Sequence, residues 1–233
     1  MINKTLIIYG GNSKIIQSCM DFFIKKFKRI IVISRIYSGK KHRKIKIIDY
    51  DKLKIEEGLR KYLDNNFVFI SSAVYSSNKL FVDEDTASIK NSFNINILNN
   101  IKIMQYLIKS GVNLKDGKFI YLSSFRVDFP TVGTSLYSSS KAYVEKLYES
   151  MAIEYSRFNL KFNVIKIGLT EYGLSNKLSY DVQSKSFQKN NIASLRLLNS
   201  DDLESTFTFL FENDYVNGSS IDLTGKIKLD LKA

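Results

Sequence analysis

The sequence has very few of the residues that stabilise small secreted proteins or bind metals. Its 233 residues include one cysteine, Cys19, one histidine, His42, and one proline, Pro130. A single cysteine excludes a disulfide framework, and one Cys with one His cannot form a structural zinc site. A Ser-His-Asp hydrolase is disfavoured too, because His42 lies inside the basic run of residues 40–44.

Long hydrophobic runs are also missing. No stretch approaches the ~18 apolar residues that a membrane helix needs. The apolar residues 6–9 are too few for a signal peptide, and they lead directly into Gly10 and Gly11. We therefore expect a cytoplasmic protein with no membrane insertion, in which Cys19 stays reduced. Because 44% of the residues are hydrophobic and 25% are charged, a disordered or fibrous chain is excluded.

Negative charge is scarce in the first 61 residues. The formal net charge is +12, and residues 1–61 hold 16 Lys and Arg residues against 5 Asp and Glu residues, whereas the rest of the chain holds 19 against 18. A nucleic-acid arm, a membrane-facing surface, a site for a phosphorylated ligand and a solvated lysine-rich surface are all consistent with this local excess. Because no nucleic-acid-binding motif is present, we expect no nucleic-acid partner.

What the sequence does contain is a regular alternation of short apolar runs and longer periodic segments. The runs predict strands at residues 5–9, 29–34, 44–49, 66–71, 118–123, 161–167 and 219–223, and the periodic segments predict helices at residues 15–26, 53–63, 88–110 and 136–159. Strands that are hydrophobic throughout and separated by helices indicate a parallel sheet covered on both faces. We therefore predict an α/β fold, a doubly wound parallel sheet of about seven strands (a Rossmann fold), in a single domain of residues 1–233.

The turns after the first two predicted strands have features of a dinucleotide site. The first turn leads from a strand into a helix, a position where backbone N–H groups bind a diphosphate. The second strand ends in Ser34 and Arg35, where an acidic residue would bind the ribose of NAD; a cation there favours the 2′-phosphate of NADP. The alternatives are a turn that binds nothing and an ordinary surface arginine. The residues of the first turn are Gly10, Gly11, Asn12, Ser13, Lys14, Ile15 and Ile16.

The strongest local signal is a tyrosine and a lysine four residues apart. On a helix, Tyr137 and Lys141 lie on one face, so the ammonium can approach the phenol. A nearby positive charge favours the phenolate and lowers the pKa of the tyrosine, which makes Tyr137 a candidate general acid for a carbonyl oxygen. This pattern is common by chance, but Ser124 precedes Tyr137 by thirteen residues at the end of a predicted strand.

These residues and their spacing make the chain resemble the short-chain dehydrogenase/reductase family along almost its whole length. Asn96, Ser124, Tyr137 and Lys141 match the catalytic tetrad of that family. By the same resemblance, residues 1–117 are mainly the cofactor-binding half and residues 118–233 the catalytic and substrate half. The implied cofactor-binding residues are Gly10, Asn12, Ser13, Lys14, Ile15, Ser34, Arg35, Asp49, Ser72, Ala73, Tyr137, Lys141, Gly168 and Thr170.

The resemblance implies hydride transfer between a nicotinamide cofactor and a carbonyl or alcohol carbon of a small molecule. Ser124 would hydrogen-bond the substrate oxygen, and Tyr137 would donate or accept its proton. Lys141 would lower the pKa of Tyr137 and hold the nicotinamide ribose, and the backbone of Asn96 would anchor a water that relays protons to Lys141. The expected cofactor is NADP(H), with NAD(H) as the second choice.

The sequence departs from the family pattern at the first turn. Lys14 and Ile16 stand where the family has glycines, and Ser71-Ser72 and Ile167 are further departures. The turn is similar to that of a subset of the family that includes reductases of keto-sugars in cell-envelope polysaccharide pathways. Two hypotheses remain: a reductase of a small polar carbonyl such as a sugar or nucleotide sugar, and a retired family member that serves as a binding or scaffold protein. The complete tetrad favours the reductase.

Two further expectations concern the substrate and the assembly. In the family, the segment after Gly168 folds over the substrate, and here its side chains are polar, which favours a hydroxylated or phosphorylated substrate over a long acyl chain; examples are Tyr172, Tyr180, Gln183, Lys185 and Lys189. Apolar residues lie beyond one face of the two long helices, for example Ile101, Met104, Leu147 and Met151. In the family the corresponding helices pair across a two-fold interface, so the resemblance implies a homodimer or homotetramer. The alternative is that these residues belong to the core.

Overall fold

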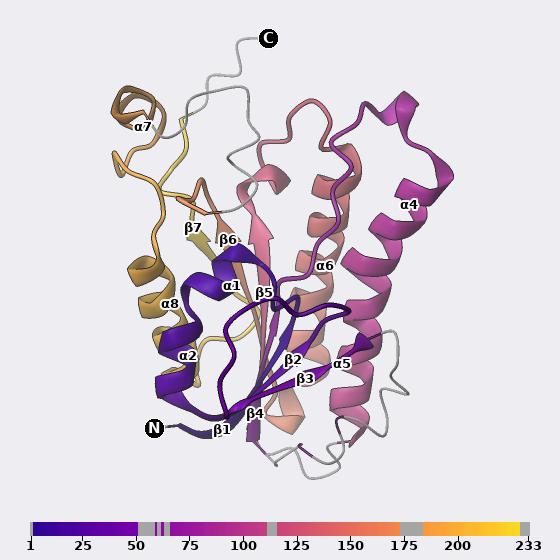
Figure 1. The fold of residues 1–233 in the computed structure, drawn as a ribbon, viewed down its shortest axis with the longest axis vertical. Helices are drawn as coiled ribbons and strands as arrows, with labels where there is room; N and C mark the ends of the chain where they lie inside the picture. Colours follow the sequence, from indigo (N-terminus) through magenta and orange to yellow (C-terminus); the bar gives the residue numbers. More distant parts are fainter. Residues whose placement is uncertain are drawn as a thin grey trace.

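The computed structural model describes residues 2–50, 59, 62, 66–110, 116–172 and 184–228. Within them, seven parallel strands form one sheet in the order β3-β2-β1-β4-β5-β6-β7 (Figure 1). The strands are β1 (Ile2–Tyr9), β2 (Phe27–Ile33), β3 (Ile45–Ile48), β4 (Asn66–Ser71), β5 (Asp116–Ser124), β6 (Lys161–Ile167) and β7 (Ser220–Leu223). The order reverses between β1 and β4, and such a switch point is where doubly wound sheets bind ligands. The predicted fold class is confirmed.

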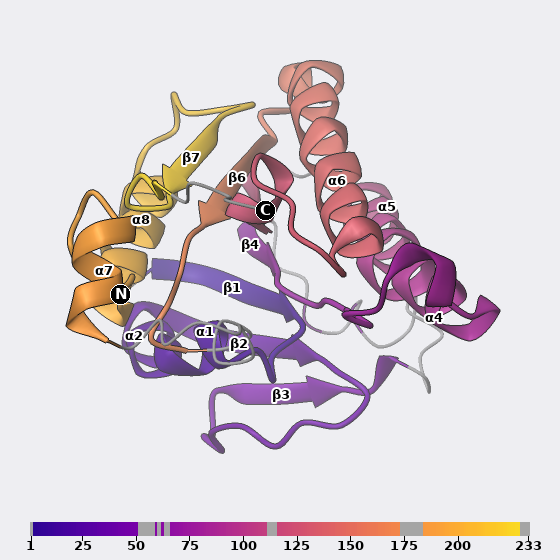
Figure 2. The ribbon, with the colours of Figure 1, turned by 90° about the horizontal axis from the view of Figure 1, so that it is seen from above.

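Helices cover both faces of the sheet. Seen from above, α5 (Asn99–Ser110) and α6 (Ser135–Glu154) lie on one side, and α2 (Met20–Lys26) and α8 (Ser200–Glu212) on the other (Figure 2). The remaining short α-helices are α1 (Lys14–Ser18), α4 (Thr86–Ser92) and α7 (Lys185–Asn191). Among the described residues, no helix combines the length and the apolar character needed to cross a membrane.

The period-two alternation of β1 divides the core into two layers. Ile7 and Tyr9 point into a cluster with residues of α5 and α6, whereas Leu6 and Ile8 point into a cluster with residues of α2 and α8. All four side chains are at most 5% exposed. A strand buried on both faces needs apolar residues at successive positions, which is why β1 is hydrophobic along most of its length.

Two predicted helices are interrupted in the structure. Residues 15–26 form α1 and α2, which meet at the buried Cys19. Residues 88–110 contain a π-helical segment, η3 (Phe93–Leu98), between α4 and α5. The predicted helix 136–159 ends earlier, at Glu154, and a 3-10 turn, η5 (Ser156–Phe158), follows it. The predicted helix 53–63 falls mostly outside the described residues.

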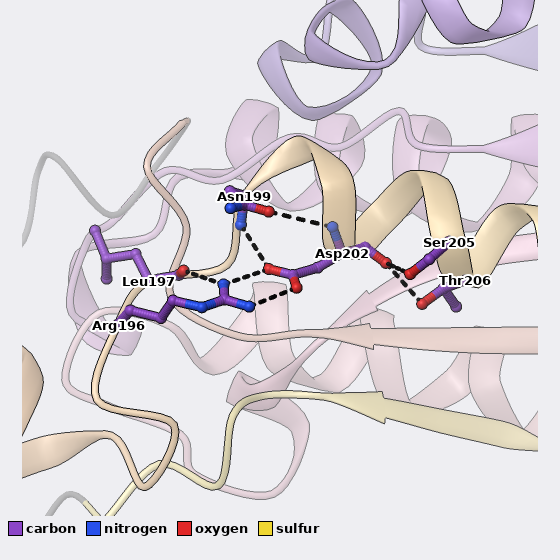
Figure 3. Close-up of polar contacts among 6 residues, drawn as sticks. All are labelled: Arg196, Leu197, Asn199, Asp202, Ser205 and Thr206. Atoms are coloured by element: carbon purple, nitrogen blue, oxygen red, sulfur yellow. Dashed lines mark hydrogen bonds and ion pairs between the residues drawn. The ribbon is translucent and has the colours of Figure 1, made fainter.

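Helix α8 is absent from the helices predicted above, although its start carries a clear sequence signal. Asn199 accepts a hydrogen bond from the Asp202 N–H at 3.2 Å, and the Asp202 carboxylate accepts one from the Asn199 N–H at 3.1 Å (Figure 3). This reciprocal capping box satisfies N–H groups that have no partner inside the helix. Arg196 adds two bonds to the same carboxylate, at 2.5 and 2.7 Å. These bonds hold the segment from Arg196 to Asn199 against the first turn of α8.

Candidate active site

A cavity of about 990 Å³ opens at the carboxyl ends of the central strands. Residues that follow β1, β2, β4 and β6 line it, and so does Ser124 at the end of β5. Two predicted site residues, Asp49 and Asn96, are not among the residues that line the cavity. The predicted residues that do line it are Gly10, Asn12, Ser13, Lys14, Ile15, Ser34, Arg35, Ser72, Ala73, Ser124, Tyr137, Lys141, Gly168 and Thr170.

Gly10 allows the ends of β1 and β4 to come together. Its φ is +90°, and a Cβ atom added there would lie 2.3 Å from the backbone nitrogen of Ala73. The backbone N–H groups of Ser72 and Ala73 both donate to the Tyr9 carbonyl oxygen, at 2.8 and 3.0 Å. Any side chain at position 10 would therefore displace the backbone that forms the wall of the cavity.

Two amide side chains hold the loop that carries Arg35 against the first turn. The Asn12 amide donates to the carbonyl oxygen of Ile36, and its oxygen accepts from the Ser38 N–H at 3.0 Å. Gln17 on α1 accepts from the Lys40 N–H at 3.1 Å. These bonds fix the backbone that follows Arg35, and Arg35 itself lines the cavity just after the end of β2.

Ile16, which stands at a glycine position of the family pattern, does not fill the cavity. Its side chain is fully buried in the core cluster that contains Ile8 and Val68. Lys14 and Ile15, its neighbours on α1, line the cavity instead. The side chain at this departure from the glycine pattern therefore packs into the core and does not line the space at the end of β1.

Tyr137, Lys141 and Ser124 converge at the other end of the cavity. Tyr137 and Lys141 lie one turn apart on α6, and the Lys141 Nζ is 5.8 Å from the centre of the Tyr137 ring. The Lys141 Nζ donates to the carbonyl oxygen of Leu122 at 2.6 Å. The Ser124 hydroxyl oxygen accepts the backbone N–H of Arg126 at 3.2 Å, and the same hydroxyl forms a hydrogen bond with Tyr137.

The pKa values at this end of the cavity are set by burial. Burial raises the pKa of Tyr137, while its hydrogen bond with Ser124 and the positive charge of Arg126 act in the opposite direction. Burial lowers the pKa of Lys141 to about 7, and Glu145 opposes that shift. Desolvation therefore outweighs the two opposing effects on Tyr137, and the expectation that Lys141 lowers the pKa of Tyr137 stays a prediction. Tyr137 is held as a phenol, the form that can donate a proton.

Asn96 ties the two sides of the site together. Its side-chain oxygen accepts the Tyr75 N–H at 2.7 Å, and its amide donates to the Tyr75 carbonyl oxygen at 3.0 Å. The amide also donates to the Ser140 hydroxyl on α6 at 2.9 Å, and Ser140 donates to the carbonyl oxygen of Tyr137. Asn96 lies in the π-helical segment, and such segments are frequent at functional sites. Its predicted role in holding a water stays a prediction.

Comparison with known proteins places this geometry in a family. A family model described as enoyl-(acyl carrier protein) reductase matches residues 56–225, well over half of the chain. The chain belongs to the short-chain dehydrogenase/reductase family. It is 26% identical over 160 residues to a 3-oxoacyl-[acyl-carrier-protein] reductase, FabG, of Buchnera aphidicola, an alignment that covers 68% of this chain and 64% of that protein. It is 21% identical over 241 residues to carbonyl reductase family member 4 of Xenopus laevis, covering 99% and 100%.

Solved structures of the family have the same fold. A 4-hydroxyisoleucine dehydrogenase complexed with NADH superposes with a TM-score of 0.81 at 18% identity, covering 96% of this chain and 98% of that one. ElxO with NADP bound superposes with a TM-score of 0.76 at 20% identity and the same coverage. The residues of this chain fit a dinucleotide, because a glycine cradle, two cations and an open cavity lie at the point where the family binds its cofactor.

Two charged residues near the catalytic end were missed by the sequence analysis. Arg126 lines the cavity two residues after Ser124, and Glu145 lies one turn after Lys141 on α6, where it accepts a hydrogen bond from Ser123. The signal for Arg126 was its place two residues after Ser124, the serine predicted to bind the substrate oxygen. For Glu145 the signal was an acidic residue four positions after Lys141, on the same helix face.

Proposed function

We propose that this dehydrogenase/reductase reduces the ketone of a small polar substrate, such as a sugar or nucleotide sugar, with NADPH preferred to NADH. The observation that carries the proposal is the convergence of Ser124, Tyr137 and Lys141 on one end of a cavity that Lys14 and Arg35 line at the other. A bound nicotinamide supplies the hydride for the carbonyl carbon. The protein supplies binding, orientation and a proton.

The proton comes from Tyr137. Its hydroxyl donates to the carbonyl oxygen of the substrate as the hydride reaches the carbon, so that an alcohol forms and the phenolate remains. The Ser124 O–H donates a hydrogen bond to the same oxygen and stabilises the developing negative charge. Charged Lys141, at or below its pKa of about 7, then stabilises the phenolate until a proton returns. Lys141 is buried and Tyr137 is half-buried, which limits the access of bulk water to the reacting atoms.

The polar residues that line the cavity support the proposal of a hydrophilic substrate. The cavity walls near the catalytic end contribute hydroxyl and amide groups, which can bind several substrate hydroxyls. Tyr172 lines the cavity, Lys185 and Lys189 lie on α7, and Tyr180 and Gln183 lie outside the described residues. A sugar-processing role in surface polysaccharide synthesis would follow from such a substrate. The polar wall residues include Tyr75, Ser76, Asn78, Asn91, Asn94 and Thr134.

The proposal is tested by titrating NADPH and NADH into the protein. Because the chain has 14 tyrosines and no tryptophan, energy transfer from tyrosine to the nicotinamide reports binding. We expect NADPH to saturate the protein at a lower concentration than NADH does. Keto-sugars and acyl-thioester ketones are then compared in an NADPH-consumption assay. Absence of binding of either dinucleotide at millimolar concentration would refute the proposal, and turnover of acyl thioesters alone would refute the substrate class.

The predicted homodimer or homotetramer stays a prediction, but the apolar residues on the two long helices no longer support it. Met104 and Met151 are buried in the core, and Ile101 and Leu147 pack against it, so these residues do not form a free apolar face. We propose a homodimer or homotetramer on family grounds. Light scattering of the purified protein measures its mass directly, and a monomer at all concentrations would contradict this.

A further inference from the structure

Arg126 is a nearly buried cation beside the catalytic residues. It lies in the short turn η4 (Phe125–Val127) directly after β5, and it lines the same cavity as Ser124 and Tyr137. Only 7% of the residue is exposed. Burial lowers the pKa of Arg126, and the phenol of Tyr137 is near enough to oppose that shift. A charge in this position is costly unless something pairs with it.

The described residues provide no acid for Arg126. Its guanidinium donates to the Thr131 hydroxyl at 2.5 Å, and its carbon lies 4.6 Å from the centre of the Phe125 ring. The nearby acids are engaged by Lys166, whose Nζ is 2.8 Å from Asp128 and 3.7 Å from Glu145. Thr131 uses one of the five N–H donors of the guanidinium.

The residues that line the whole cavity also carry more positive than negative charge. Among the described residues that line it, none is Asp or Glu, whereas five are Lys or Arg. Lys14 and Arg35 are accounted for by the phosphates of a dinucleotide, and Lys141 by the catalytic step. Arg126 has neither role, and it lies where the substrate must bind to reach Tyr137. The five cations are Lys14, Arg35, Lys102, Arg126 and Lys141.

We propose that Arg126 binds an anionic group of the substrate, a carboxylate or a phosphate, while Ser124 and Tyr137 bind its carbonyl oxygen. This inference rests on the proposed function and narrows the substrate to a carbonyl compound that carries an anion close to its ketone. A planar guanidinium binds a carboxylate or a phosphate through two parallel N–H bonds, which fixes the orientation of the substrate as well as its affinity. Thr131 and Phe125 hold the guanidinium in place before the substrate arrives.

The first experiment measures anion binding without turnover. Thermal unfolding of the NADPH-saturated protein is followed with increasing succinate or inorganic phosphate, at constant ionic strength. The variants are Arg126→Met, Arg126→Lys and the matched control Arg157→Met, which removes an exposed arginine stacked on Phe158 at 4.8 Å. We expect at least one anion to stabilise the wild type and the control, Arg126→Lys to keep part of the effect, and Arg126→Met to lose it.

The two anions distinguish the two possible groups. A response to succinate alone identifies a carboxylate subsite, and a response to phosphate alone identifies a phosphate subsite. Binding of phosphate at Lys14 or Arg35 would persist in Arg126→Met, so only the difference between the proteins counts. An equal response in wild type and Arg126→Met, or no response in either, overturns the inference.

The second experiment compares substrates that differ only in charge. Acetoacetate is paired with methyl acetoacetate, and dihydroxyacetone phosphate with dihydroxyacetone. We expect kcat/KM for at least one anionic member to fall about 10- to 100-fold in Arg126→Met, with the neutral partner changed less than 3-fold, the range expected for hydrogen bonds to a charged group. An equal fall for both members contradicts the inference.

The outcomes separate this inference from the proposed function. If no carbonyl compound is reduced but an anion binds only when Arg126 is present, the reductase assignment fails and the anion subsite stands. If carbonyl compounds are reduced with the same charge dependence in wild type and Arg126→Met, the reductase assignment stands and the subsite fails.

Discussion

The Lys141 ammonium nitrogen lies 5.8 Å from the centre of the Tyr137 ring, on the buried side of α6. Burial acts on both groups in the direction of neutrality, raising the pKa of Tyr137 and lowering that of Lys141 to about 7. The protein therefore presents a phenol that can donate a proton, backed by an amine that becomes charged close to neutral pH.

The first prediction concerns Tyr137 itself. Tyr137→Phe removes the proton donor and leaves the ring in place, so the rate of carbonyl reduction should fall by about 10²- to 10⁴-fold, the range typical of general acid catalysis. Dinucleotide binding, measured by energy transfer, should change little. Tyr143→Phe on the exposed face of the same helix is the matched control and should keep full activity. Retention of more than a tenth of the rate in Tyr137→Phe would contradict the assigned role.

The second prediction concerns pH and Lys141. Because its folded pKa of about 7 lies below the ordinary value of 10.5, the unfolded chain binds a proton between pH 7 and 10.5 that the folded protein does not hold. This group therefore makes stability rise with pH across that window, and the cost of burying its charge is greatest below pH 7. Lys141→Met should unfold at a temperature several degrees above wild type at pH 6, with an advantage that shrinks by pH 10.

Thermal unfolding followed by circular dichroism at pH 6, 8 and 10 measures this difference. Lys146→Met, which removes an exposed lysine from the same helix, controls for the loss of a positive charge. A stability difference between Lys141→Met and wild type that does not change with pH would show that Lys141 stays charged throughout the range.

The third prediction concerns the choice of dinucleotide. Arg35→Gln should weaken NADPH binding about 10- to 100-fold, because it removes a charge-assisted hydrogen bond to the 2′-phosphate, and should leave NADH binding within about 3-fold. Arg43→Gln, in the same basic segment but outside the cavity, is the matched control. An equal loss for both dinucleotides would place Arg35 away from the 2′-phosphate.

The fourth prediction concerns the unusual isoleucine of the first turn. Ile16 is fully buried between α1 and the sheet, so Ile16→Ala should lower the free energy of unfolding by about 2–5 kcal/mol through the cavity it leaves. Ile16→Gly, which restores the family residue, should destabilise further without improving the affinity for NADPH. Urea unfolding and dinucleotide titration measure the two effects separately. Tighter NADPH binding by the glycine variant would show that Ile16 does narrow the site.

Much of the fold was accessible from local patterns. Strands such as Asn66–Ser71 and Lys161–Ile167 are short, apolar and bounded by polar residues, and the structure has them at the predicted residues. Helix α8 was missed because its apolar residues are interleaved with Thr and Ser, although Asn199 and Asp202 form a capping box that the sequence contains. The π-helical segment at Asn96 was not predictable from periodicity, since a single residue of extra winding barely changes the apolar pattern.

The sequence by itself determined the sheet, the family and the spacing of Ser124, Tyr137 and Lys141, because these depend on strand and helix periodicity and on residues close along the chain. Only the tertiary structure decided how charged these residues are and which others join them. Burial, which no local pattern reports, raises the pKa of Tyr137, lowers that of Lys141 and leaves the Arg126 guanidinium beside them without an acidic partner among the described residues. The same burial places Ile16 in the core and leaves the dinucleotide end of the cavity open.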